Sequence, residues 1–460
     1  MIKDNAAFLL KLEDIFDSDY LFLDPAECWN YGYDNSRRHR EPIAVVFPRT
    51  HQEIVDTVKL CLQHHVAITA RGAGTGTTGA SVPPENAIVL STEKMDNIIS
   101  VDPDNRVMVV EPGVSNLAVQ QAAAEHGFFW PPDPTSSGIC TIGGNLAYNS
   151  AGPRAVKYGT PRENTLGLTC VTGKGETLKT GAYTTKSVVG YDLTRLIIGS
   201  EGTLAIISQA TLKLTPLAEA KSTLQATYTS VNSAAKAVAH IMAQPITPCA
   251  LEFMDDMAIS LVQEKAQLEL PKQAKALLMI EIDGQQYGLE EMTKKVADSA
   301  TNEGTIDVKI ATSPQQIKQL WQARKALSPS LRKVAPKKIN EDVVVPVSNI
   351  PILISELQIL SKKYNIPIVN FGHAGNGNIH VNLLVQMDQI ELAKTCLADV
   401  FSLVISLKGS LSGEHGIGLE KRDYINLELD SVAIALMQNI KTQFDPYHLL
   451  NPDKVFPVIP

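Results

Sequence analysis

The sequence has 460 residues, of which 44% are hydrophobic and 20% are charged. This is the composition of an ordinary globular protein, and the length exceeds what one hydrophobic core serves, so we expect two or more domains. The formal net charge of −8 argues against a nucleic-acid-binding protein, because neutralising phosphates requires a basic face.

The sequence shows no targeting or membrane-spanning segment. No apolar run approaches the roughly 18 to 20 residues that cross a bilayer. The N-terminus lacks the basic start and the small-residue cleavage site of a secretory signal. The cysteines are scattered without a C-x-x-C pair, which argues against an iron–sulfur cluster or a disulfide framework. We therefore expect a cytoplasmic protein and leave peripheral contact with a membrane open.

After an N-terminal segment whose apolar residues at helical spacing predict a docked surface helix, the chain continues with a predicted strand–helix–strand unit over residues 43–70. A strand at Ile43–Phe47 is followed by a helix that begins at Thr50, and Val66–Thr69 forms the next strand. The glycine loop that comes next, Arg71–Gly79, leads into further strand-like segments rather than into a helix. A Rossmann unit needs a helix directly after its glycine loop, so that interpretation is disfavoured.

Three glycine-rich segments suggest contacts with phosphate. Glycines free the backbone to turn consecutive N–H groups toward one anion, although they also occur in tight turns that only need close packing. For the loop 71–79 alone, both explanations stay open. Gly143-Gly144-Asn145 and Ser200-Glu201-Gly202-Thr203 have the same character. Together the three segments favour a large cofactor with several phosphates, such as a dinucleotide.

From about residue 222, strands alternate with helices, which predicts a second α+β domain. In this part, Ile379–Leu383 alternates as a strand with His380 and Asn382 on one face, and a glycine-rich turn can bring His373 back beside His380. Glu414 and His415 follow in the segment SGEHGIG. Two imidazoles and a carboxylate suit a divalent metal such as Zn²⁺, whereas single histidines are usually ordinary core or loop residues. Both explanations remain open from the residues alone.

Residues 321–328, WQARKALS, read as a helix that carries a candidate substrate anchor. The guanidinium of Arg324 can bind a carboxylate through two parallel N–H bonds. The neighbouring cations Lys325, Arg332, Lys333 and Lys337 fit a solvated basic face at least as well.

Several long motifs occur in the order found in a known family. RGAGTGTTG, PDPTSS, GGNLAYNSAG and GYDLTRLIIGSEGTLAII resemble the vanillyl-alcohol-oxidase-type (PCMH-type) FAD-binding domain, in its D-lactate and glycolate dehydrogenase branch, over about residues 40–217. GHAGNGNIHVN and SGEHGIG resemble the FAD-linked oxidase C-terminal domain of metal-dependent D-2-hydroxy-acid dehydrogenases. The resemblance implies an α+β fold: a two-part α/β FAD-binding domain with N-terminal helices over residues 1–218, an α+β substrate-binding cap domain over 219–430, and a segment over 431–460 that returns to the FAD domain.

The same resemblance assigns roles to residues. The position of His415 would be the catalytic base, that of Arg324 the carboxylate clamp, and Lys338 and Asn382 would lie near the substrate. The metal ligands would be His373, His380 and Glu414. The FAD-binding positions would be Arg71, Gly72, Ala73, Gly74, Thr75, Gly76, Gly79, Pro134, Thr135, Gly138, Gly143, Gly144, Asn149, Glu201, Gly202, Ile207 and Asn451. Relatives with covalent flavin carry histidine where this chain has Thr75, so we expect non-covalent FAD.

These assignments predict FAD-dependent oxidation of a D-2-hydroxy acid to its 2-oxo acid, with D-lactate as the first candidate. The C2 hydride would pass to flavin N5, the hydroxyl would bind the metal, and His415 would take its proton. D-2-hydroxyglutarate and glycolate are the alternatives within the family. A non-redox flavin transferase and a non-catalytic FAD-binding protein are more distant ones. The electron acceptor would be external, namely a quinone, an electron-transfer flavoprotein or a cytochrome, and formation of a homodimer is left open.

Overall fold

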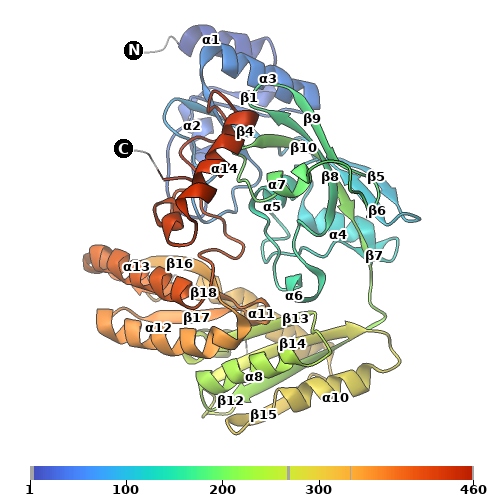
Figure 1. The fold of residues 1–460 in the computed structure, drawn as a ribbon, viewed down its shortest axis with the longest axis vertical. Helices are drawn as coiled ribbons and strands as arrows, with labels where there is room; N and C mark the ends of the chain where they lie inside the picture. Colours follow the sequence, from blue (N-terminus) through green and yellow to red (C-terminus); the bar gives the residue numbers. More distant parts are fainter. Residues whose placement is uncertain (1–4, 267–269, 332, 458–460) are drawn as a thin grey trace. The chain divides into compact units, whose positions relative to one another are not determined.

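The computed structural model describes residues 5–266, 270–331 and 333–457. The chain divides into two compact units, which are considered separately (Figure 1). The first unit contains Met1–Ala151, Gly159–Leu217 and Glu414–Pro460, and the second contains Gly152–Tyr158 and Ala218–Gly413. Both units combine helices with sheets, which confirms the predicted α+β class. Across the described residues, we find no helix that has both the length and the apolar character needed to span a lipid bilayer.

The first unit is built on a four-stranded and a five-stranded sheet, in the orders β1-β2-β4-β3 and β5-β6-β10-β8-β9, and β11 pairs with β7. Its elements are α1 (Asn5–Glu13), η1 (Ser18–Tyr20), β1 (Leu21–Phe22), α2 (Pro25–Cys28), η2 (Trp29–Tyr31), β2 (Ala44–Val46), α3 (His51–His64), β3 (Ala67–Arg71), β4 (Ala87–Ser91), β5 (Ile98–Asp102), β6 (Val107–Val110), α4 (Asn116–Ala124), β7 (Phe128–Phe129), α5 (Ile142–Tyr148), β8 (Thr165–Thr172), β9 (Thr177–Gly181), α7 (Leu193–Ile197), β10 (Ala205–Lys213), β11 (Thr215–Pro216), η6 (Arg422–Leu427) and α14 (Ser431–Phe444).

The predicted strand–helix–strand unit is present as β2, α3 and β3. The two strands do not pair with each other, because each pairs in parallel with β4, which lies between them. The Thr50 side chain caps α3 by accepting the N–H of Glu53. The carboxylate of Glu53 accepts the N–H of Arg49 at 2.6 Å. The start of the helix is therefore satisfied from both sides.

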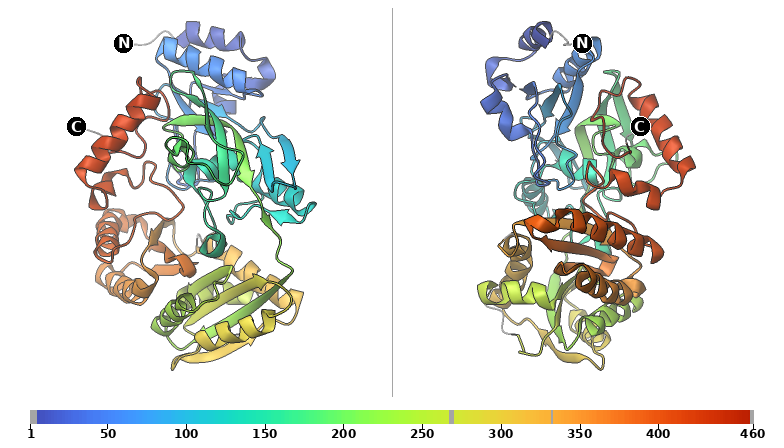
Figure 2. Two further views of the ribbon diagram at one scale, coloured as in Figure 1. Left: turned by 45° about the vertical axis from the view of Figure 1, so that its right-hand side comes forward. Right: turned by 90° about the vertical axis from the view of Figure 1, so that its left-hand side faces the viewer.

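The N-terminal helix α1 packs on α3, and the two lie side by side in both views of Figure 2. Its apolar residues recur at helical spacing, so Phe8 and Leu12 share one face. Both side chains are buried in a core cluster with Ile54 and Val58 of α3. Burying such side chains contributes about 1.5 to 3 kcal/mol each, which holds α1 in place.

The outer edge of β3 is covered by residues from the end of the chain. The N–H of Ile68 donates to the carbonyl of Leu449 at 2.8 Å, and the N–H of Asn451 donates to the carbonyl of Ile68 at 2.7 Å. Ile68 and Leu450 thus form a parallel bridge. The backbone groups that an edge strand would leave open are paired here, directly before the glycine loop.

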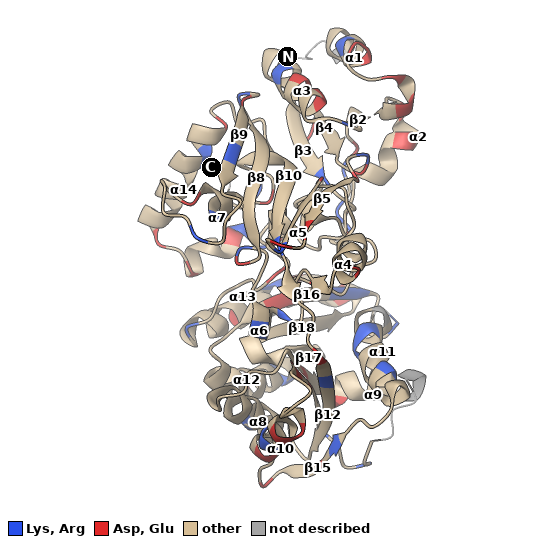
Figure 3. Cartoon of the chain, turned by 90° about the vertical axis from the view of Figure 1, so that its right-hand side faces the viewer, with Lys and Arg blue, Asp and Glu red and all other residues tan. Residues whose placement is uncertain are grey.

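The second unit is a seven-stranded antiparallel sheet with the order β15-β12-β14-β13-β17-β18-β16. Figure 3 shows α9 and α11 on one side of this sheet and α8, α10 and α12 on the other. Its elements are α6 (Ala155–Tyr158), β12 (Ala220–Tyr228), α8 (Val231–Ala243), β13 (Ala250–Asp255), α9 (Asp256–Ala266), β14 (Ala276–Gly284), α10 (Leu289–Ser299), β15 (Thr305–Ile310), α11 (Pro314–Leu331), β16 (Lys337–Val344), η3 (Val347–Asn349), α12 (Ile350–Tyr364), β17 (Ile368–His373), η4 (Ala374–Asn376), β18 (Asn378–Val385), η5 (Met387–Gln389) and α13 (Ile390–Ser406).

The short helix α6 comes from the middle of the glycine-rich part of the sequence but packs on the second unit. The Tyr158 hydroxyl donates to the carboxylate of Asp283 in β14 at 2.8 Å, and Lys157 forms an ion pair with the same carboxylate. Val156 packs closely on Gly375 in the turn that follows β17. One side of this turn is therefore held by a segment that lies far from it in the sequence.

Candidate active site

One face of the seven-stranded sheet gathers the polar residues that the sequence singled out. In an antiparallel pair, residues directly opposite each other project to the same face. Glu252 lies opposite His373. Phe371, two residues before His373, lies opposite His380, and Asp342 also lies opposite His380. These side chains, with Asn382, therefore lie on the face that α9 and α11 cover.

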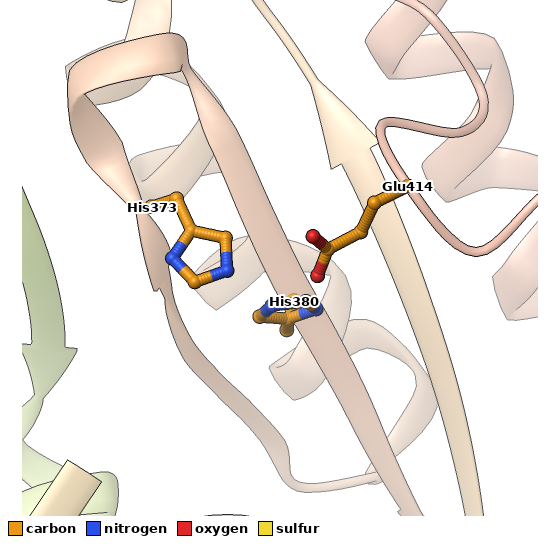
Figure 4. Close-up of side chains that lie close together, drawn as sticks. All are labelled: His373, His380 and Glu414. Atoms are coloured by element: carbon orange, nitrogen blue, oxygen red, sulfur yellow. The ribbon is translucent and has the colours of Figure 1, made fainter. Parts of the chain in front are cut away.

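His373, His380 and Glu414 lie close together (Figure 4). One possible ligand atom from each residue lies within 4.8 Å of the others, and the two imidazole rings are 5.4 Å apart at an angle of 80°. The hairpin β17–η4–β18 brings the histidines together, with Gly377 in the left-handed region at φ 75°. Two imidazoles and one carboxylate form a donor set that fits Zn²⁺ or a similar ion.

The segment that leads to Glu414 is held by Asp342 of β16. The Ser412 hydroxyl donates to the Asp342 carboxylate at 3.0 Å, and the N–H of Gly413 donates to it at 2.9 Å. Ser410 also pairs with Val344 in the same strand. Glu414 is bonded directly to Gly413, so Asp342 restricts where the carboxylate of Glu414 can lie. The sequence reasoning did not identify Asp342.

Glu252 in β13 is the second residue that the sequence reasoning missed. It is fully buried, and one carboxylate oxygen accepts a hydrogen bond from Nδ1 of His373 at 2.6 Å. The other oxygen forms an ion pair with Nε of Arg324. Burial by itself raises the pKa of Glu252, but the charges and hydrogen bonds of His373 and Arg324 bring it below the ordinary value. Glu252 therefore connects a candidate metal ligand to the candidate substrate anchor.

The helix α11 contacts the same face through two polar side chains at helical spacing. Trp321 donates to Glu281 of β14 at 3.3 Å, and Arg324, one turn later, contacts Glu252. Arg324 is buried, and its guanidinium lies 4.9 Å from the centre of the Phe371 ring. Positions three and four residues apart share one side of a helix, which explains why these residues face the sheet together.

Lys338 and Asn382 border the same region. Lys338 Nζ contacts the hydroxyl of Ser328 at 3.0 Å, and Ser328 lies one turn after Arg324 in α11. Asn382 is fully buried and donates to the carbonyls of Val369 and His380. Its Oδ1 is buried and has no hydrogen-bond partner in the described part of the chain. Such an orphaned acceptor fits a site that takes a polar ligand.

In the first unit, β3 ends at Arg71 and the glycine loop begins. The buried guanidinium of Arg71 donates to the carbonyls of Tyr33 at 2.6 Å and Asn30 at 3.4 Å. It also lies directly against Gly74, where φ is 65° and an added Cβ would overlap the guanidinium. The structure therefore places Arg71 beneath the loop as a support for its backbone.

A second glycine segment lies beside this loop. Thr141 caps α5 by accepting the N–H of Gly144, and a Cβ added at Gly72 would overlap the Thr141 hydroxyl. Asn149 ends α5 in the left-handed conformation at φ 57°. Two polar atoms in this region, Thr77 Oγ1 and Asn145 Nδ2, are buried without a partner among the described residues. Closely packed glycines and orphaned polar atoms fit a bound polar cofactor such as FAD.

Glu201 holds the segment that contains His415. Its buried carboxylate accepts the N–H groups of Ile417 at 2.6 Å and Gly418 at 2.8 Å. The hydroxyl of Thr78, in the glycine loop, donates to the carbonyl of His415 at 3.1 Å. Burial is the main cause that raises the pKa of Glu201 to about 7. The predicted base is thus fixed by residues of the glycine-rich segments in its own unit.

Asn451 joins two of these segments. Its side chain donates to the carbonyls of Ala80 at 2.9 Å and Glu201 at 2.8 Å. The remaining predicted FAD-binding residues lie in the first unit. Ala73, Thr75, Gly76 and Gly79 belong to the glycine loop, Pro134, Thr135 and Gly138 to the segment between β7 and α5, Gly143 to the first turn of α5, Gly202 to the turn after Glu201, and Ile207 to β10.

Comparison with known proteins identifies the family. The family described as FAD linked oxidases, C-terminal domain, matches residues 217–455, and the FAD binding domain matches residues 42–181. The chain belongs to the FAD-linked oxidases. This confirms the resemblance that the sequence motifs indicated.

Several curated relatives of this FAD-linked oxidase cover nearly its whole length. The glycolate oxidase subunit GlcD of Bacillus subtilis (strain 168) is 38% identical over 430 residues, which are 93% of this chain and 92% of the relative. The D-lactate dehydrogenase of Archaeoglobus fulgidus is 36% identical, over 91% of this chain and 92% of the relative. The D-2-hydroxyglutarate dehydrogenase of Xanthomonas citri pv. viticola is 33% identical, over 97% and 96%.

The fold is also found among solved structures. p-Cresol methylhydroxylase with substrate bound matches with a TM-score of 0.78 at 16% identity, over 98% of this chain and 96% of that chain. Alkyldihydroxyacetonephosphate synthase matches with a TM-score of 0.75 at 21% identity, over 98% of this chain and 85% of that chain. At these identities the likeness shows the PCMH-type fold alone.

Proposed function

We propose that this FAD-linked oxidase oxidises a D-2-hydroxy acid to its 2-oxo acid, with D-lactate as the first candidate. The observation that carries the proposal is the donor set of His373, His380 and Glu414, together with Arg324 of α11, which is buried against the sheet face that carries the histidines. A hydroxy acid offers a hydroxyl and a carboxylate, which are the groups that a metal and an arginine recognise.

The residues described above indicate two bound groups, FAD and a divalent metal ion. Non-covalent FAD would be held by the glycine loop 71–79, by Gly143 and Gly144, and by the loop that contains Glu201. The chemistry supplied by the bound groups is hydride acceptance by FAD and, at a divalent ion such as Zn²⁺, acidification of the substrate hydroxyl. Because Thr75 stands in the loop, acid precipitation should leave the yellow colour in the supernatant, and a yellow pellet would refute non-covalent binding.

The side chains of this chain then have separate tasks. Arg324 binds and orients the substrate carboxylate through its guanidinium, and Asn382 offers a buried acceptor on the sheet face that carries His380. His415 accepts the proton of the substrate hydroxyl, and an imidazole suits this because it changes its charge near neutral pH. Glu201 and Thr78 keep the backbone around His415 in one place, so the base does not have to be ordered in each turnover.

The substrate within this class depends on a second cation. D-2-hydroxyglutarate carries another carboxylate, which needs a second cation. Lys338 of β16 is the candidate, because it contacts Ser328, which lies one turn after Arg324 in α11. This makes D-2-hydroxyglutarate the second candidate. Glycolate is the third, supported by the relative that is 38% identical. Electrons would leave the flavin to an external acceptor, namely a quinone, an electron-transfer flavoprotein or a cytochrome.

The test is an anaerobic screen of D- and L-2-hydroxy acids that follows bleaching of the flavin, with and without a chelator. We expect bleaching by D-isomers only, and loss of bleaching after chelation. A flavin that no hydroxy acid bleaches would exclude the proposed oxidation and leave the non-redox transferase or a passive FAD-binding protein.

A further inference from the structure

We propose that Glu252 is a positioning residue that fixes His373 as a metal ligand and Arg324 as a carboxylate anchor at the same time. This rests on the function proposed above. All three residues belong to the second unit, and their contacts are made by buried side chains. None of the sequence motifs pointed to Glu252, which lies in the apolar segment ALEFMD.

The contact with His373 decides which ring nitrogen can bind a metal. Glu252 is an acceptor, so the imidazole nitrogen at 2.6 Å from it, Nδ1, carries the proton. The lone pair of a neutral imidazole then lies on Nε2, the other ring nitrogen. Carboxylates that hold metal-binding histidines in this way orient the ring and raise its basicity. Glu252 therefore selects Nε2 of His373 as the coordinating atom.

The contact with Arg324 decides which edge of the guanidinium is open. Nε donates to Glu252, and this is the one hydrogen bond of the Arg324 side chain among the described residues. The terminal nitrogens Nη1 and Nη2 remain for a ligand. A substrate carboxylate would therefore approach Arg324 end-on, and the direction of that approach is set by a residue that also holds His373.

An uncharged isostere cannot keep Nδ1 of His373 protonated and accept from Arg324 at the same time. A glutamine at this position has one acceptor oxygen and one amide group that donates. If the oxygen faces Arg324, the amide faces Nδ1 of His373 and favours the tautomer with the proton on Nε2, which cannot bind a metal. If the oxygen faces His373, the amide faces the Arg324 donor. The first arrangement therefore removes the lone pair from Nε2 of His373, and the second leaves two buried donors facing each other without an acceptor.

The chain provides a matched control for this substitution. Glu281 in β14 lies on the same sheet face, is also buried, and also accepts a hydrogen bond from α11, in its case from Trp321. It contacts none of the three candidate metal ligands. Glu281→Gln should therefore disturb the packing between α11 and the sheet to a similar extent without changing the state of His373.

The experiment measures Zn²⁺ affinity of the full-length, FAD-loaded protein by competition with a chromogenic chelator. Glu252→Gln should bind Zn²⁺ about 10- to 100-fold more weakly than the wild type, and Glu281→Gln should bind it as the wild type does. The visible spectrum of the Co²⁺-loaded protein should change only in Glu252→Gln. Thermal unfolding and FAD content check that both variants fold, and Glu252→Asp replaces Glu252→Gln if the latter does not.

Each outcome has one meaning. Equal Zn²⁺ affinity in Glu252→Gln and the wild type overturns the inference, and so does an equal loss in Glu252→Gln and Glu281→Gln, since that indicates a general effect of packing. A wild-type protein that binds no more Zn²⁺ than His373→Ala refutes the metal of the proposed function itself. That result is distinct from failure of Glu252 alone, because it appears before any glutamate is changed.

Discussion

The hydroxyl of Thr78 donates a hydrogen bond to the backbone carbonyl of His415. The first residue belongs to the glycine loop that follows β3, and the second is the predicted base near the other end of the chain. The same short segment is held from a second side by the carboxylate of Glu201. The position of the base is therefore set by backbone contacts and not only by its own side chain.

Replacing Thr78 by valine should slow flavin reduction about fivefold while FAD stays bound. The substitution keeps the shape of the side chain but removes one hydrogen bond, worth about 1 kcal/mol, and a barrier higher by that amount corresponds to a factor of about five. Stopped-flow reduction by D-lactate measures the rate, and flavin absorbance after gel filtration measures retained FAD. Thr77→Val is the control, because the Thr77 hydroxyl lies in the same glycine loop but is buried without a partner among the described residues, and we propose that the bound FAD supplies that partner. It should weaken FAD binding, and the idea fails if the two variants behave alike.

The stability of the first unit should depend on pH through Glu201. The pKa of this carboxyl is about 7 in the folded protein, above the ordinary value of 4.5. Between these values the folded state holds a proton that the unfolded state has released. The contribution of Glu201 is therefore fully present below about pH 4.5 and is lost as the pH rises through about 7. Thermal unfolding midpoints should fall more from pH 5 to pH 7.5 in the wild type than in Glu201→Gln, and parallel curves would contradict this assignment.

His415→Ala and His373→Ala should separate the base from the metal site. Without the proton acceptor, flavin reduction should fall by about 10² to 10⁴-fold, with FAD and metal both retained. Loss of the His373 imidazole should lower bound metal in addition to the rate. Metal analysis of the purified proteins distinguishes the two variants. Reduction at the wild-type rate in both would refute the roles given to these histidines.

Lys338→Met should discriminate between the candidate substrates. Methionine keeps the length of the side chain but removes its charge. If Lys338 binds a second carboxylate, the KM for D-2-hydroxyglutarate should rise about 10- to 100-fold, because a hydrogen bond between charged groups contributes about 1.5 to 3 kcal/mol. The KM for D-lactate should change little. An equal change for both acids would show that Lys338 does not select a dicarboxylate.

The strands and the candidate metal ligands could be predicted from local patterns. Alternation of apolar residues placed His380 and Asn382 on one face of a strand, and the glycines after His373 indicated a tight turn back to it. The order of strand, glycine loop and strand around Arg71 excluded a Rossmann unit, and the structure has β4 after the loop. These features depend on residues that are neighbours in the sequence, and therefore they could be predicted from the sequence alone.

The supports of the site could not be predicted in the same way. Glu252 and Asp342 hold residues that are far away in the sequence, and the residues next to them in the sequence do not indicate which partner each carboxylate binds. One signal was available in retrospect. An acid in the middle of an apolar strand such as ALEFMD must find a buried partner, because an unpaired buried charge is costly. The short segment with Lys157 and Tyr158 gave no such signal before its packing on β14 was known.

The cover that Leu449 and Asn451 provide for β3 has a consequence for biosynthesis. On the ribosome, β3 and the glycine loop emerge long before residues 449–451 exist, so the nascent first unit presents an unprotected strand until those residues have been synthesised. Exposed strand edges pair readily with other chains. We expect C-terminally shortened products to accumulate as insoluble protein, and slow translation of the last segment to increase the demand for chaperones.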